Sequence, residues 1–112
     1  MDTIYISISN LDNKRLEELI QTNHFSQEQI DEILVYINQH NYIEGLKILT
    51  KYKTPSQFYI NRCLTTSLYN NFLLMSIELI KYASLEKLNN ILINEEKYNK
   101  QIIYQIKKKL IK

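Results

Sequence analysis

Residues 41–52 read NYIEGLKILTKY and residues 71–82 read NFLLMSIELIKY, so one short amphipathic pattern occurs twice. Each segment opens on asparagine, a residue favoured at helix starts and turns, and continues with apolar residues at helical spacing. A weaker third copy, LDNKRLEELI, fills residues 11–20. The repetition predicts short helices that recur along the chain.

Helix-capping signals lie between these segments. Ser26 is followed by Gln29, which is the spacing of a capping box. In the run Thr54-Pro55-Ser56-Gln57, threonine is expected to cap a helix whose first residue is the proline. Other capping residues stand directly before apolar runs: Asp12, Asn41, Asn71, Ser84 and Asn94.

Two interleaved series of caps share a period of about 29 residues, which is typical of stacked two-helix units. The first series is Asp12, Asn41 and Asn71, and the second is Ser26, Thr54 and Ser84. We therefore predict an all-α fold of stacked antiparallel helical hairpins, with about six to seven helices in one domain over residues 1–112. Residues 94–112 are expected to form a basic C-terminal capping helix, and a compact helical bundle without a repeat is the alternative.

The N-terminal residues 3–9 read TIYISIS and fit two structures. Their alternation of apolar and polar residues is typical of a strand, which could pair with its copy in a homodimer. A short helix with Ile4, Ile8 and Leu11 on one side fits as well. We favour the helix, as the first half of the first hairpin, because a lone strand has no partner in the rest of the chain.

The two repeated segments resemble the second helix of an ankyrin repeat, with residues 11–20 as a weaker copy. Several ankyrin features are missing: of the Thr-Pro-Leu-His opening only Thr54-Pro55 is present, and asparagine replaces the turn glycine at residues 41 and 71. The single glycine, Gly45, falls inside an expected helix. The resemblance implies a degenerate ankyrin-like stack that binds protein through one face, and it implies no substrate and no cofactor.

The composition is that of an ordinary soluble globular protein, with 45% hydrophobic and 23% charged residues. No signal peptide and no apolar run of membrane-spanning length is visible, and the single cysteine cannot form an intramolecular disulfide. We therefore expect an intracellular, cytoplasmic protein. The wealth of Ile, Asn, Lys and Tyr indicates an AT-rich genome, which is common among viruses and phages and would place the protein in a host cytoplasm.

The sequence contains no set of residues that is typical of an active site or a cofactor site. His24 and His40 stand 16 residues apart, and one cysteine is too few for a structural zinc site. A single glycine excludes a glycine-rich phosphate loop. Cys63 is expected to be a buried apolar residue, with a nucleophilic role as a minor alternative. We predict a protein that is not an enzyme and has no metal or cofactor.

The leading functional hypothesis is a protein–protein interaction module, a viral or phage protein that binds a host factor. Its expected contact residues are large side chains at the predicted turns: Tyr42, Tyr69 and Phe72. Charge supports a second hypothesis, because residues 1–56 carry a net −3 and residues 57–112 a net +5. A small nucleic-acid-associated regulator would contact phosphates through four C-terminal lysines: Lys107, Lys108, Lys109 and Lys112. A bundle of the death-domain or viral Bcl-2-like kind is the third hypothesis.

Overall fold

The computed structural model describes residues 2–111, and this part of the chain contains eight α-helices, one 3-10 turn and no strand. The predicted all-α fold is therefore confirmed, although the helix count exceeds the expected six to seven. The helices in chain order are α1 (Asp2–Ser9), α2 (Asn13–Thr22), α3 (Gln27–Gln39), α4 (Ile43–Tyr52), α5 (Gln57–Tyr69), α6 (Leu73–Ile80), α7 (Leu85–Leu92) and α8 (Lys100–Leu110), with the 3-10 turn η1 (Glu95–Lys97) before the last.

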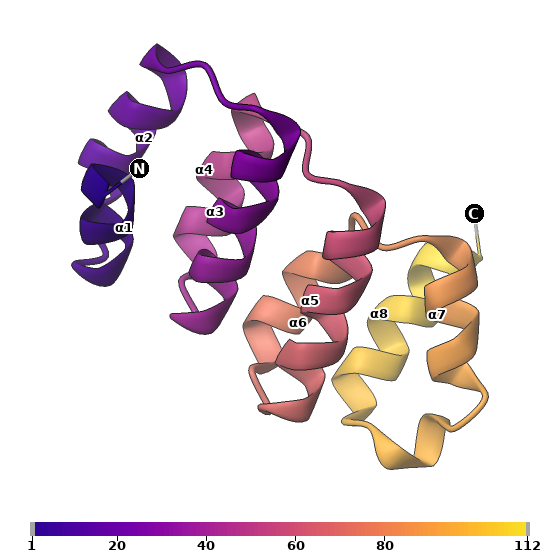
Figure 1. Cartoon of the computed structure of the whole chain (residues 1–112). Helices are drawn as coiled ribbons and strands as arrows, with labels where there is room; N and C mark the ends of the chain where they lie inside the picture. Colours follow the sequence, from indigo (N-terminus) through magenta and orange to yellow (C-terminus); the bar gives the residue numbers. More distant parts are fainter. Residues whose placement is uncertain (1, 112) are drawn as a thin grey trace.

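Consecutive helices form antiparallel hairpins that stand side by side in chain order, rather than packing around a central helix (Figure 1). The body is elongated, at 41 × 23 × 20 Å. Helices α1, α3 and α5 pack against one another as a first-helix layer, and α2, α4, α6 and α8 pack as a second-helix layer behind it. Each layer joins neighbouring hairpins, so the hydrophobic core is continuous along the row.

Each of the first three hairpins turns through one residue in the left-handed backbone region. These residues are Leu11, Asn41 and Asn71, with φ of 53°, 49° and 60°. The residue after each turn donates its amide to a carbonyl five residues earlier, which satisfies the end of the preceding helix. Asparagine tolerates this conformation better than most side chains, so Asn41 and Asn71 take the place of a turn glycine.

The structural period is 30 residues, slightly longer than the predicted 29. Helices α2, α4 and α6 begin at residues 13, 43 and 73, and α1, α3 and α5 end at residues 9, 39 and 69. Asp12 caps α2 as predicted, with its side chain accepting from the Arg15 amide at 3.1 Å. The prediction that Asn41 and Asn71 are N-caps was wrong by one residue, because both are needed at the left-handed turn position.

The predicted start of α5 at Pro55 was also wrong. The helix begins at Gln57 with Ser56 as its N-cap, and Pro55 is buried ahead of it. By contrast, the capping box at the start of α3 is confirmed: the Ser26 hydroxyl accepts from the Gln29 amide at 3.1 Å, and the Ser26 amide donates to Gln29 Oε1 at 2.9 Å.

A polar side chain of one hairpin caps the first helix of the next. The buried Asp31 of α3 accepts from the Ser56 amide at 2.8 Å and from the Ser56 hydroxyl at 2.5 Å. Thirty residues later, Asn61 of α5 accepts from the Ser84 amide at 3.1 Å and donates to the Ser84 hydroxyl at 3.1 Å. These two clasps join successive hairpins through directional bonds in addition to apolar packing.

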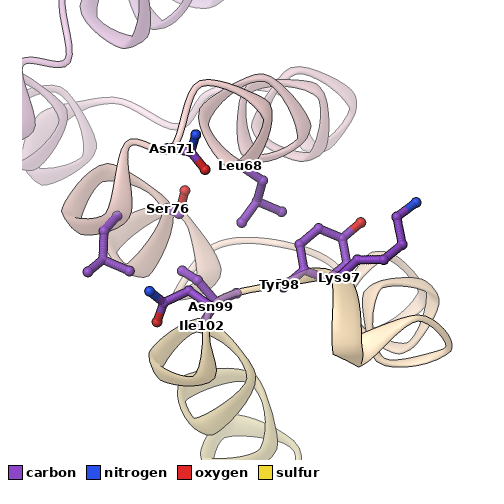
Figure 2. Close-up of a pocket in the computed structure, with 8 residues that line it drawn as sticks. Leu68, Asn71, Ser76, Lys97, Tyr98, Asn99 and Ile102 are labelled. Atoms are coloured by element: carbon purple, nitrogen blue, oxygen red, sulfur yellow. The ribbon is translucent and has the colours of Figure 1, made fainter.

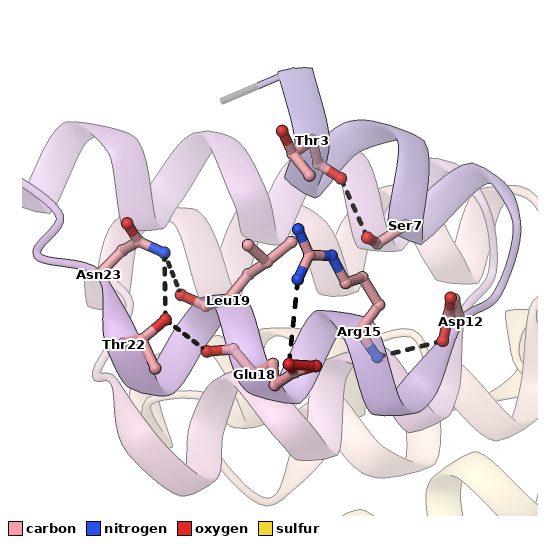
Figure 3. A network of polar contacts seen from close by, with 8 residues as sticks. All are labelled: Thr3, Ser7, Asp12, Arg15, Glu18, Leu19, Thr22 and Asn23. Carbon is pink, nitrogen blue, oxygen red and sulfur yellow. Dashed lines mark hydrogen bonds and ion pairs between the residues drawn. The ribbon is translucent and has the colours of Figure 1, made fainter.

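The N-terminal segment is a helix, which confirms the favoured prediction; the alternative of a strand that pairs with its copy in a homodimer is wrong. Helix α1 is the element that takes the helix count to eight. The adjoining α2 is capped at both ends by side chains (Figure 3). At its C-terminal end the Thr22 hydroxyl donates to the Glu18 carbonyl at 2.7 Å, and the Asn23 amide group donates to the Leu19 carbonyl at 2.8 Å.

The C-terminal segment is not one helix from residue 94. Residues Glu95–Lys97 form the 3-10 turn, and α8 begins at Lys100 under a cap from Asn99, whose Oδ1 accepts from the Gln101 amide at 2.7 Å. The shorter α8 still lies against α6 and closes the second-helix layer.

Asn38 of α3 is a polar residue in the core, at 3% exposure. Its Nδ2 donates to the Cys63 carbonyl at 3.3 Å, but its Oδ1 finds no hydrogen-bond partner among the described residues. The equivalent positions in the neighbouring hairpins are the apolar Ile8 and Leu68.

We expect Asn38→Leu to raise the free energy of unfolding by about 1–2 kcal/mol, because it removes a buried acceptor that has no donor and adds apolar contact. Urea unfolding followed by circular dichroism measures the change. A loss of stability would mean that the bond to the Cys63 carbonyl outweighs the unsatisfied oxygen.

Candidate functional site

The three residues predicted to contact a partner lie in very different surroundings. Tyr69, the last residue of α5, is 86% exposed. Phe72 is half-buried against the core. Tyr42 is only 5% exposed, and its hydroxyl donates to Asn13 Oδ1 of α2. The Tyr42 ring packs inside the protein, where it fills the space above Gly45, and is not presented to a partner.

The C-terminal lysines are partly occupied by contacts within the chain. Lys109 donates to the carbonyls of Ile80, Lys81 and Ala83 at 2.8, 2.8 and 3.1 Å, so its ammonium group caps the end of α6. Burial lowers the pKa of Lys109. Lys107 forms an ion pair with Glu95 at 3.3 Å, and Lys108 is exposed. Lys112 lies outside the described residues.

A hollow of about 360 Å³ opens across the first-helix layer, and none of the predicted contact residues lines it. Its walls come from three helices: Tyr5 from α1, Tyr59 from α5, and Tyr36 among several residues of α3. The α3 residues include the carboxylates Glu28, Asp31 and Glu32, and none of the described residues that line the hollow is Lys or Arg. We call this site the tyrosine hollow.

Two of the three rings that line the tyrosine hollow, those of Tyr5 and Tyr36, are held in place by aromatic neighbours. Tyr5 and Tyr36 have centroids 4.6 Å apart, and Tyr36 and His40 have centroids 4.5 Å apart. The Tyr36 hydroxyl also shares a hydrogen bond of 3.0 Å with the Ser9 hydroxyl. Such contacts fix a ring before a partner arrives, which lowers the entropic cost of binding.

The carboxylates differ in how far they are already engaged. Both carboxylate oxygens of Asp31 already accept hydrogen bonds from Ser56. Glu32 accepts only from the Tyr5 hydroxyl, at 3.3 Å, and Glu28 and Glu32 are both exposed and form no ion pair with a described residue. Burial, followed by the charge of Glu32, raises the pKa of Tyr5, so the phenol stays protonated and donates.

Charge is divided between the two layers at the N-terminal end of the row. Helices α1 and α3 carry four carboxylates and no basic residue, whereas α2 and α4 carry four basic and three acidic residues. Helices α1 and α3 of the first-helix layer therefore present a negative potential that no basic residue of either helix neutralises, while α5 of the same layer carries Arg62.

The sign changes toward the C-terminal end. A second hollow of about 300 Å³, between α5 and α7, is lined by Lys87 and Lys97 together with the exposed Tyr69. A third hollow lies where the last hairpin meets the α5–α6 turn, with Leu68 and Tyr98 among its lining residues (Figure 2). At about 100 Å³ it is small beside the roughly 300–1,000 Å³ of typical ligand sites. The tyrosine hollow is the better candidate.

In the part of the chain that the structure describes, neither an exposed thiol nor a metal-binding group lies beside these hollows. Cys63 is 3% exposed, and burial raises the pKa of its thiol to about 11. Within residues 2–111 no group of three His, Cys, Asp or Glu side chains is placed to hold a metal ion. Across the same residues, no helix is long and apolar enough to cross a membrane.

We expect Cys63 to react with iodoacetamide at pH 8 at least about 100-fold more slowly in the folded protein than in urea, because a thiol with a raised pKa is almost entirely protonated at that pH and the sulfur is enclosed. Mass spectrometry of timed samples measures the rate. Rapid alkylation of the folded chain would instead point to an accessible, activated thiol.

Comparison with known proteins gave no neighbour for this chain: no family model, curated protein or solved structure matches it significantly.

The tyrosine hollow was missed from sequence because its residues are far apart along the chain. A weak signal was present: α1 and α3 contain tyrosines and carboxylates but no Lys or Arg, which is unusual in a lysine-rich chain. Only the packing of α1 on α3, and of α3 on α5, brings Tyr5, Tyr36 and Tyr59 to one site.

Proposed function

We propose that this protein is a non-enzymatic binding module that holds a basic segment of a partner protein on its first-helix layer. The observation that carries the proposal is the tyrosine hollow, where rings from three helices and uncompensated carboxylates line one depression. Tyrosine is enriched in protein interfaces because it offers a large rigid ring with a polar tip. The carboxylates add electrostatic attraction for a partner of opposite sign.

The nature of the site favours a partner segment over a small substrate. The hollow is partly open to solvent, and the polar groups among its described lining residues are carboxylates, phenols and an amide. A row of hairpins offers the extended face that such a segment needs. The likeness to ankyrin second helices supports the same kind of role.

We also propose, from composition alone, that the protein comes from a virus or phage and meets a host protein inside the cell. The nucleic-acid alternative is less well supported. Of the four lysines that it needs, Lys109 already donates to three carbonyls and Lys107 is paired with Glu95.

Selection from a random peptide library tests the binding proposal. The folded protein is the bait, and the expected product is a family of peptides rich in Arg or Lys with an apolar neighbour. The double variant Glu28→Lys/Glu32→Lys is expected to lose these peptides at least about 30-fold in affinity, because it reverses the potential of the first-helix layer.

The matched control is Glu18→Lys/Glu44→Lys, which makes the same change in net charge on exposed residues of the second-helix layer. It should retain binding nearly unchanged. Equal losses in the two double variants would mean that net charge alone attracts the peptides, and a library that yields no basic peptide would overturn the proposal.

A further inference from the structure

We infer that the tyrosine hollow is a receptor for one cationic side chain of the partner, and that it prefers the guanidinium of arginine. This inference rests on the proposed function, because it names the group by which a basic segment would be anchored.

The rings favour a cation over a neutral group. Tyr5, Tyr36 and Tyr59 approach the hollow from α1, α3 and α5, and the face of an aromatic ring attracts a positive charge placed within about 6 Å. The volume of about 360 Å³ is at the lower end of ligand sites, which suits one long side chain rather than a folded element.

The carboxylates give the hollow a negative charge that no described cation of the chain neutralises. Glu28 and Glu32 face the solvent, neither forms an ion pair with a described residue, and no basic side chain within residues 2–111 lines the hollow. A positively charged occupant would relieve this local excess of negative charge. A negatively charged or neutral occupant would gain nothing from it.

Arginine fits the combination of groups better than lysine. A guanidinium is planar, can stack on a tyrosine ring and can donate two parallel bonds to a carboxylate such as Glu32, whereas an ammonium group is compact and more strongly hydrated. The Tyr5 hydroxyl already donates to Glu32, at 3.3 Å, and holds this carboxylate beside the ring.

Titration with capped single amino acids tests the inference directly. The probes are the N-acetyl N-methylamides of arginine, of lysine and of citrulline, which has nearly the shape of arginine but no charge. Ring signals of Tyr5, Tyr36 and Tyr59 are followed by nuclear magnetic resonance. We expect arginine to shift these signals and to bind about tenfold more tightly than citrulline, with lysine between them.

Two variants should weaken the response while the fold is retained. Tyr59→Leu takes away one wall, and Glu32→Gln removes a charge at constant shape. Each is expected to weaken arginine binding at least about fivefold. The controls are Tyr104→Leu, an exposed tyrosine on α8 at 59% exposure, and Glu44→Gln on α4, both of which should bind like the parent protein.

The outcomes separate this inference from the proposed function. Equal binding of arginine and citrulline, or an arginine affinity that Tyr59→Leu leaves unchanged, would overturn the inference. Library peptides could bind the first-helix layer with an affinity that does not change when each of their arginines is replaced. That result would disprove the inference of an arginine site and leave the proposed binding function intact. If arginine binds the hollow while no library peptide is selected, the receptor is supported and the proposed function fails.

Discussion

Asp31→Ala is expected to lower the free energy of unfolding by about 3 kcal/mol, because hydrogen bonds to a buried carboxylate are strong and their loss leaves donors without partners. Asp31 is 5% exposed and accepts from the Ser56 amide, the Ser56 hydroxyl and the Gln27 side chain. Ser56 is the N-cap of α5 but makes no side-chain cap bond of its own. The carboxylate therefore substitutes for the missing cap across the hairpin boundary.

The chain supplies a matched control for this residue. Asn61 occupies the equivalent position 30 residues later and holds Ser84 with an amide in place of a carboxylate. Asp31→Asn should therefore cost less than about 1 kcal/mol. Urea unfolding monitored by circular dichroism measures both variants. If Asp31→Asn destabilises the fold as much as Asp31→Ala, the negative charge and not the hydrogen-bond geometry is what matters at this position.

Gly45→Ala is expected to destabilise the protein by about 2 kcal/mol, although alanine normally stabilises a helix interior by about 1 kcal/mol relative to glycine. A Cβ at residue 45 would lie 2.5 Å from Cδ2 of the Tyr42 ring. That ring cannot easily move, because it is buried and its hydroxyl is bonded to Asn13 of α2. Residue 45 must therefore be glycine because the Tyr42 ring leaves no space for a Cβ, and not because its backbone conformation excludes other residues.

Removal of the tyrosine ring should reverse the sign of this effect. In a Tyr42→Ala background, Gly45→Ala is expected to stabilise the protein by about 0.5–1 kcal/mol, since only the helix propensity remains. Thermal and urea unfolding of the four proteins in the cycle measure the coupling between the two positions. A Gly45→Ala change that destabilises both backgrounds equally would show that Tyr42 is not the cause.

The fold could be predicted largely from sequence because its signals are local. Apolar spacing such as that of Ile30, Ile33 and Ile37 and caps such as Ser26 depend on neighbours within one or two turns, and both are confirmed. The error at the start of α5 occurred where a distant group decides the structure. Thr54-Pro55 has a good local start signal, yet α5 begins at Gln57 because Ser56 is held by Asp31 from the preceding hairpin.

The candidate site could not be predicted in the same way. Tyr42 was expected to be a contact residue because it lies at a turn, but its ring is buried between α2 and α4. Tyr69, at the end of α5, is exposed as expected. Tyr5, Tyr36 and Tyr59 meet only through the packing of three helices, and no short sequence window contains two of them at helical spacing.

The two clasps between hairpins have a consequence for how the molecule comes apart. Each hairpin is joined mainly to its immediate neighbours, so disruption can enter from either end and move inward one unit at a time. The second hairpin receives support from both sides, and Asp31 makes the α5 cap of the third hairpin depend on it. Damage at Asp31 would therefore weaken the coupling between the second and third hairpins, which would then be held by apolar packing alone, whereas damage near α1 or α8 would fray only one end.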